Sequence, residues 1–142
     1  MKTPNNQQPT MSTPLTPYDY TATIESVTDG DTVVVLIDLG FSILHRVNAR
    51  LFGCNAAEHG TPGGDAATAH LRALLSAGTR VGLRSHGADK YGGRTDASLL
   101  LADATGKLTM DLVTGLIADG FAASWNGQGT KPVPAWPIPA KA

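Results

Sequence analysis

Apolar and polar residues alternate along the first part of the chain with the period of two that indicates β-strands. Residues 18–27 alternate roughly, which predicts a strand with one wetter face. Residues 32–39 are β-branched and apolar, so they predict a second, more buried strand. Residues 41–53 predict a third strand, on which Arg46 and Arg50 share one face while apolar residues occupy the other.

A glycine between two acids separates the first two predicted strands, in the run Asp29-Gly30-Asp31. Asp-Gly between β-prone runs is a strong hairpin signal, and we expect Gly30 to supply a positive φ without steric cost. The three strands then form a meander. Its turns should bring Asp31 and the loop of residues 55–58 to one end of the sheet.

The rest of the chain changes twice to the helical period. Residues 65–77 carry an apolar stripe at helical spacing that ends before a glycine, and residues 108–119 carry a second. Between them we expect a fourth strand over residues 79–85, a loop over 87–93 and a fifth strand that opens at Arg94. The order β-β-β-α-β-β-α is that of the OB-fold, a five-stranded β-barrel with helices, so the predicted class is α+β.

Length and composition fit one domain, because 142 residues with 42% hydrophobic content supply one core and no second. We predict a disordered arm over residues 1–17, a folded domain over 18–125 and an extended proline-rich tail over 126–142 that could dock on a protein partner. No stretch has the length of a membrane span or the pattern of a secretory signal. We therefore expect a cytoplasmic protein without a membrane partner.

Charge and cysteine usage limit the chemistry. Eleven basic and twelve acidic residues give a formal net charge of −1, so any anion site must come from local placement of charge. Cys54 is the only cysteine, which excludes an internal disulfide and a cysteine zinc cluster. Oxygen-bearing side chains instead gather in the predicted loops: Asp29, Asp31, Asn55, Glu58 and Asp89. Such ligands fit a hard cation such as Ca²⁺.

The chain carries three short motifs in a fixed order: Asp29-Gly-Asp-Thr32, Arg50-Leu-Phe-Gly-Cys-Asn-Ala-Ala-Glu58 and Asp89-Lys-Tyr-Gly-Gly-Arg94. Together they resemble the staphylococcal nuclease (thermonuclease) family, over roughly residues 20–125. Members of that family have an OB-fold and hydrolyse phosphodiester bonds of DNA and RNA with Ca²⁺. The resemblance therefore implies a calcium-dependent nuclease whose partner is DNA or RNA.

The resemblance also implies a role for each matching residue. The implied catalytic residues are two arginines that grip the scissile phosphate and a glutamate that positions or deprotonates the attacking water: Arg50, Arg94 and Glu58. The implied calcium site has a direct carboxylate ligand, a supporting acid, an amide in place of the family's second carboxylate, and a backbone carbonyl: Asp31, Asp29, Asn55 and Ala56. The implied substrate contacts are two residues on a neighbouring phosphate and an aromatic near a base: Lys90, Tyr91 and Trp125.

Several of these residues also have a plain structural explanation. Arg50 can lay its stem along the core with its head in water, an exposed Lys90 is usually only solvated, and Trp125 suits packing better than base stacking. The chemistry of phosphodiester hydrolysis favours a functional role for Arg50, Glu58 and Arg94 taken together. Its anionic transition state needs a cation and forked donors, and its water needs a base.

The chain departs from the family pattern at several points. Asn55 replaces a carboxylate, which should weaken Ca²⁺ binding, Ala57 replaces a proline, and Gly93 looks inserted. The family's C-terminal helix has no counterpart, and short versions of this kind resemble phage-borne nucleases. Two other functions stay open: a catalytically inactive OB-fold module that binds single-stranded nucleic acid, and a protein-interaction module. We expect a monomer.

Overall fold

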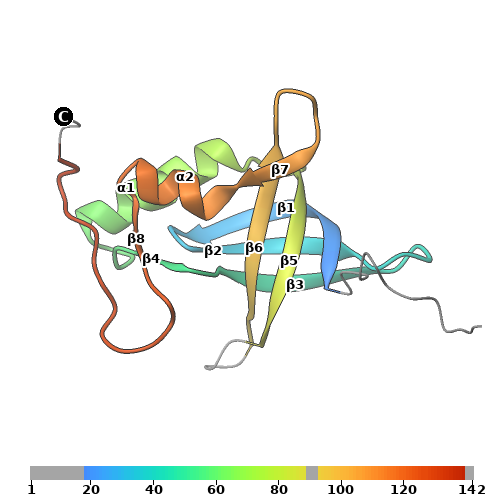
Figure 1. The fold of residues 1–142 in the computed structure, drawn as a ribbon, viewed down its shortest axis with the longest axis horizontal. Coiled ribbons are helices and arrows are strands. Elements are labelled where there is room, and N and C mark those ends of the chain that lie inside the picture. Colours follow the sequence, from blue (N-terminus) through green and yellow to red (C-terminus); the bar gives the residue numbers. More distant parts are fainter. Residues whose placement is uncertain (1–17, 89–92, 140–142) are drawn as a thin grey trace, which may run out of the picture.

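Five strands close into a barrel in the computed structural model, which describes residues 18–88 and 93–139. The strands β1 (Asp19–Asp29), β2 (Thr32–Asp38) and β3 (Leu44–Leu51) form an antiparallel meander. Strand β5 (Arg80–Ala88) pairs with β1, and β6 (Thr95–Ala102) pairs with β5. A parallel pairing of β3 with β6 closes the barrel. Figure 1 shows β5 and β6 crossing in front of β1, β2 and β3.

This closed five-stranded barrel with two helices confirms the predicted OB-fold α+β class. The predicted arm over residues 1–17 and the candidate residues Lys90 and Tyr91 lie outside the described residues. Within the described residues, no helix is long and apolar enough to cross a membrane.

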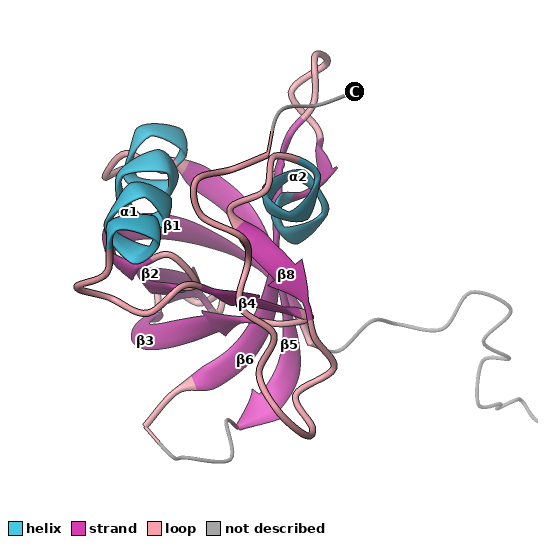
Figure 2. Cartoon of the chain, turned by 90° about the vertical axis from the view of Figure 1, so that its left-hand side faces the viewer, coloured by secondary structure: helices cyan, strands magenta, loops and turns pink. Residues whose placement is uncertain are grey.

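The first helix begins earlier than predicted. Helix α1 spans Pro62–Leu74, and Thr61 caps it by accepting a hydrogen bond from the Gly64 N–H. The sequence prediction treated the glycines and the proline here as a loop, but proline fits the first turn of a helix because no partner is needed for its nitrogen. Figure 2 shows α1 and the second helix, α2 (Leu112–Ala118), on one side of the barrel.

The predicted helix over residues 108–119 was wrong in its first part. Residues Leu108–Asp111 form strand β7, which pairs antiparallel with the outer edge of β6. Only after Asp111 does the chain turn helical, because the Asp111 carboxylate accepts the N–H of Thr114 and so caps α2.

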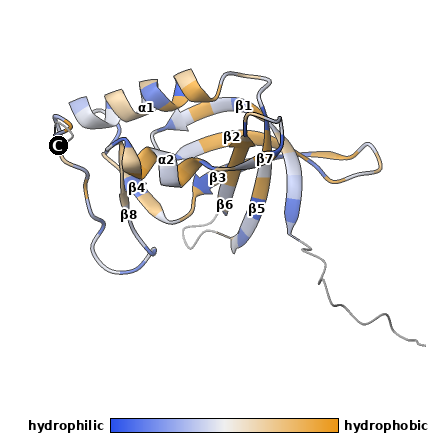
Figure 3. Ribbon diagram, turned by 45° about the horizontal axis from the view of Figure 1, so that its top comes forward, coloured by the Kyte–Doolittle hydropathy of each residue, from blue (hydrophilic) through white to orange (hydrophobic). Residues whose placement is uncertain are grey.

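The predicted third strand also starts too early. Phe41 and Ser42 have positive φ values of 54° and 62°, so the β2–β3 connection is a tight loop and β3 starts only at Leu44. The apolar residues at this tip are exposed: Leu39, Phe41, Ile43 and Leu44. In Figure 3 the tip projects beyond the rest of the barrel.

The Asp29–Asp31 hairpin is present, but the reason given for its glycine was wrong. Asp29 pairs with Thr32 across the hairpin, and Gly30 is not among the described residues with positive φ. A Cβ on Gly30 would lie 2.7 Å from the Cβ of Ala67 and 2.9 Å from that of Ala56. The glycine is therefore needed because the hairpin lies directly against α1 and the segment after β3.

The sequence prediction missed a small second sheet, in which β4 (Cys54–Ala56) pairs antiparallel with β8 (Ala122–Ser124). The core fills the barrel and the space beneath the helices with aliphatic side chains, including Ile24, Val33, Leu51, Leu71, Leu83, Leu99 and Leu116. Cys54 is buried, and burial raises the pKa of its thiol to about 12. The hairpin, β4 and the start of α1 thus meet at the end of the barrel opposite the β2–β3 tip (Figure 1).

Candidate active site

Asp31 lies at the centre of this end of the barrel. Its Oδ2 accepts the backbone N–H of Ala56 at 2.9 Å, and its Oδ1 accepts the hydroxyl of Thr32 at 3.2 Å. The contact with Ala56 confirms that the first hairpin and the 55–58 loop meet. Asp29 supports the turn, since its Oδ1 accepts the Asp31 N–H at 3.1 Å.

Burial raises the pKa of Asp31 above its usual 3.8, with Asp29 adding to the rise. The positive charge of Arg50 and the N–H of Ala56 act in the opposite direction but do not cancel the loss of water. The negative charge of the buried Asp31 carboxylate is therefore only partly compensated by its neighbours, and it attracts a further positive charge.

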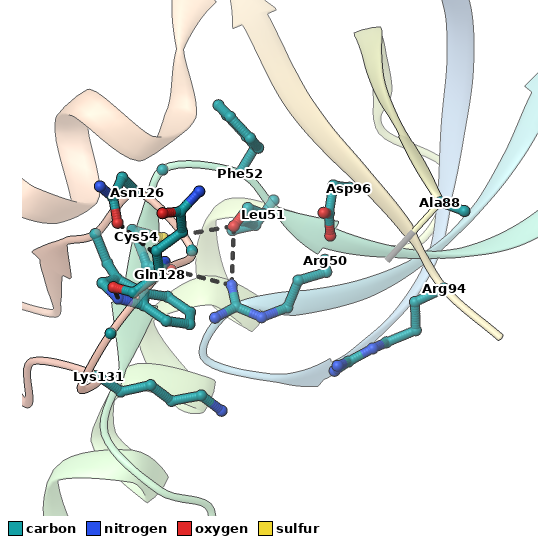
Figure 4. A pocket seen from close by; sticks show the side chains of 14 residues that line it. Arg50, Leu51, Phe52, Cys54, Ala88, Arg94, Asp96, Asn126, Gln128 and Lys131 are labelled. Atoms are coloured by element: carbon teal, nitrogen blue, oxygen red, sulfur yellow. Dashed lines mark hydrogen bonds between the residues drawn. The ribbon is translucent and has the colours of Figure 1, made fainter. Parts of the chain in front are cut away.

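Arg50 is buried beside it, with an N···O distance of 3.5 Å between Nη2 and the Asp31 Oδ2. Its Nη1 donates to the carbonyls of Leu51 and Cys54, at 2.8 and 3.1 Å, and its Nη2 donates to Asn55 Oδ1 at 3.3 Å. Figure 4 shows the two carbonyl contacts. These bonds fix the plane of the guanidinium group, so the arrangement presents a preorganised cation to whatever enters the site.

Glu58 is positioned by the beginning of α1. Its carbonyl oxygen accepts the Thr61 hydroxyl at 2.6 Å and the Thr61 N–H at 3.2 Å. A Cβ on Gly64 would lie only 1.8 Å from that same oxygen, so only glycine allows the helix to approach so closely. The helix cap, the glycine and the glutamate backbone therefore form one rigid unit.

A cavity of about 550 Å³ joins these groups. Its lining includes the predicted catalytic and metal-site residues: Asp29, Asp31, Arg50, Asn55, Ala56, Glu58 and Arg94. Trp125 is not in that lining. It lines a second cavity of about 510 Å³, and its Nε1 donates to the carbonyl of Gln128 at 2.8 Å.

The oxygen donors match a hard cation in type. Asp31 and Ala56 both line the cavity, and burial of the Asp31 carboxylate outweighs the charge and hydrogen bond that favour its charged form. Among the described residues there is no group of three His, Cys, Asp or Glu side chains that could hold a metal, so neutral oxygens would have to complete the site. Asn55 uses its oxygen for Arg50 and its nitrogen for the carbonyl of Pro132, at 2.9 Å.

The sequence analysis missed one wall of this cavity. The proline-rich tail returns over the site, and Lys131, Val133, Pro134 and Trp136 line the cavity. Figure 2 shows the tail running as a long loop past β8 toward α1. No periodicity in the tail indicated this return, because an extended segment without hydrogen-bonded pairing leaves its direction to side-chain contacts far away in the sequence.

No model of a known protein family matches the chain, and no curated protein matches it.

Proposed function

We propose that this protein is a calcium-dependent nuclease that hydrolyses phosphodiester bonds of DNA or RNA. The observation that supports it best is that one cavity is lined by residues from all three sequence motifs: Asp31 from the first, Arg50 and Glu58 from the second, and Arg94 from the third. These residues are far apart in the chain and supply two cations, a buried acid and a candidate base.

The roles follow from charge and position. The guanidinium groups of Arg50 and Arg94 bind the phosphate oxygens and offset the charge that grows in the transition state. Glu58 orients the attacking water and accepts its proton. Asp31 and the Ala56 carbonyl would hold Ca²⁺, which supplies electrostatic stabilisation to the phosphate when it is bound.

The test is cleavage of plasmid and single-stranded DNA by the purified protein, with Ca²⁺ or with a chelator. We expect calcium-dependent cleavage that falls by about 100-fold or more in Glu58→Gln. Glu25→Gln is the matched control, because Glu25 pairs with Arg46 on the surface and lies in neither cavity. Equal cleavage by Glu58→Gln and Glu25→Gln would refute the proposed mechanism.

A second candidate is an inactive module that binds single-stranded nucleic acid. The observation in its favour is that the described residues contain no cluster of three acidic, histidine or cysteine ligands. A shift in the mobility of single-stranded DNA without cleavage, at any calcium concentration, would support this candidate over the nuclease.

A further inference from the structure

Two cavities, of about 550 and 510 Å³, share three side chains, and all three carry a positive charge: Arg50, Arg94 and Lys131. Acids flank them unevenly. Asp29, Asp31 and Glu58 line only the first cavity, whereas Asp96 is the one acid that lines the second among the described residues. These three cations thus lie between the cavity lined by Asp31 and the cavity lined by Trp125.

Figure 4 shows the ends of the three cationic side chains directed toward a common space. Arg50 and Arg94 come from the barrel, while Lys131 reaches the space from the tail on the opposite side. An anion in that space would be attracted by all three positive charges. The lysine also lies near the second pocket's aromatic wall, with its Nζ 5.8 Å from the centre of the Trp125 ring.

The position of Lys131 is fixed by its neighbours along the tail. The carbonyl of Pro132, the next residue, accepts a hydrogen bond from Asn55. Further on, a Cβ on Gly63 would lie 3.1 Å from the Cβ of Trp136, so this tryptophan packs on the start of α1. A Cβ on Gly120 would likewise lie 2.8 Å from Ile138. Three contacts therefore hold the tail against the site.

We propose that Lys131 is a phosphate-binding residue, and that the three cations bind a nucleic-acid strand that runs from one cavity into the other. This inference rests on the proposed function, which it extends by naming a residue and a length of substrate. The cations border two cavities of similar volume, so a ligand that uses both carries more than one nucleotide. The whole protein has a net charge of −1 and does not attract nucleic acid by its overall charge. The three cations supply that attraction locally.

The test measures binding without cleavage. The full-length protein in a chelator is titrated into a fluorescein-labelled oligothymidylate, and anisotropy is followed over a range of KCl concentrations. The variants are Lys131→Gln, Lys131→Arg and the matched control Lys107→Gln, which removes the same charge from an exposed lysine at the β6–β7 turn that lines neither cavity. Thermal unfolding of each variant checks that the fold is intact.

We expect Lys131→Gln to lower the slope of log K against log salt by about 0.7, the value for one lost phosphate contact on a single strand. At 0.1 M salt that slope corresponds to a loss of affinity of about fivefold. Lys131→Arg should bind like the wild type, and so should Lys107→Gln. Trp136→Ala, which keeps the lysine but removes an anchor of the tail, should lose part of the same affinity.

Equal slopes for Lys131→Gln and Lys107→Gln would overturn the proposal, as would the absence of any binding by the wild type. Thymidine monophosphate serves as a competitor, and competition at the same concentration as the oligothymidylate would overturn the inference of a strand. The nuclease proposal is judged separately by calcium-dependent cleavage. Loss of slope in Lys131→Gln without cleavage by the wild type would support the binding inference and refute the nuclease.

Discussion

The two ends of strand β3 carry the same residue type in opposite surroundings. At the outer end, Arg46 is exposed, and its Nη2 donates to Glu25 at 2.6 Å. At the inner end, Arg50 is only 8% exposed and is enclosed by carbonyls, an amide and Asp31. Both arginines lie on the same face of the strand, because their positions differ by four and side chains alternate between faces with a period of two.

The difference lies in how each charge is balanced. Arg46 and Glu25 form an ion pair at the surface, and each favours the charged form of the other. The pKa of Glu25 is therefore lowered by its hydrogen bond with Arg46, and the pKa of Arg46 is raised by the same bond. Near Arg50 the balance is incomplete, because burial still raises the pKa of Asp31. The comparison teaches that an arginine indicates a functional site when it is buried beside a carboxylate whose negative charge its surroundings do not fully compensate.

The largest expected effect comes from removing each arginine in turn. Arg50→Gln leaves the buried Asp31 carboxylate without its cation, so we expect a loss of about 3 kcal/mol in the free energy of unfolding. Cleavage should fall by about 100-fold or more. Arg46→Gln should change neither quantity appreciably, because exposed pairs contribute little. Urea unfolding and the plasmid assay measure both, and equal destabilisation by the two substitutions would contradict the comparison.

Arg94→Ala should separate activity from stability. Arg94 lies just before β6 and lines both cavities, and it is only half-buried, whereas Arg50 is buried. We expect cleavage to fall by about 100-fold while the melting temperature stays close to that of the wild type. A variant that melts far below the wild type would show that Arg94 is structural.

Asn55→Asp adds a negative charge in β4, next to the inner end of β3, and should increase the difference between the two ends of β3. A second carboxylate beside Asp31 should tighten Ca²⁺ binding by about tenfold, measured by calorimetry. The new side chain cannot donate to the carbonyl of Pro132, so the tail should be held less firmly. Asn48→Asp, at an exposed position of β3, is the control. Equal calcium affinity in the two variants would exclude Asn55 from the metal site.

The smallest expected effect is a pH dependence of opposite sign at a buried and an exposed acid. Hydrogen bonds from Thr105 and Thr109 lower the pKa of Asp103 to about 2 from 3.8, so its contribution to stability is present above pH 3.8 and is lost as the pH falls toward 2. The raised pKa of Asp31 means that its contribution falls as the pH rises from 3.8 through that raised value.

Melting temperatures of Asp103→Asn and Asp31→Asn in calcium-free buffer, between about pH 2 and pH 6, measure this difference. Relative to the wild type, the melting temperature of Asp103→Asn should fall as the pH rises, and that of Asp31→Asn should increase. Parallel curves for the two variants would mean that burial does not dominate at Asp31.

Local patterns in the sequence determined most of the barrel. Alternation placed β1 and β2, the Asp29–Asp31 hairpin joined them, and the order of elements specified the OB-fold, because these features depend on neighbours a few residues apart. The early start of α1 was also present in the sequence, as a threonine followed by a proline, but the nearby glycines obscured it. The predicted three-strand meander was sufficient to predict that Asp31 and the 55–58 loop would meet.

Only the tertiary structure decided which arginine of β3 is buried and where the tail lies. Periodicity assigns Arg46 and Arg50 to one face but cannot say what covers that face. Here β4, the start of α1 and residues 131–136 enclose only the inner end of the strand. The tail is held by contacts with Asn55 and Gly63, which lie 77 and 73 residues away from their partners Pro132 and Trp136 in the chain. Such long-range packing leaves no periodic trace in a proline-rich segment, so the third cation of the site became visible only in the fold.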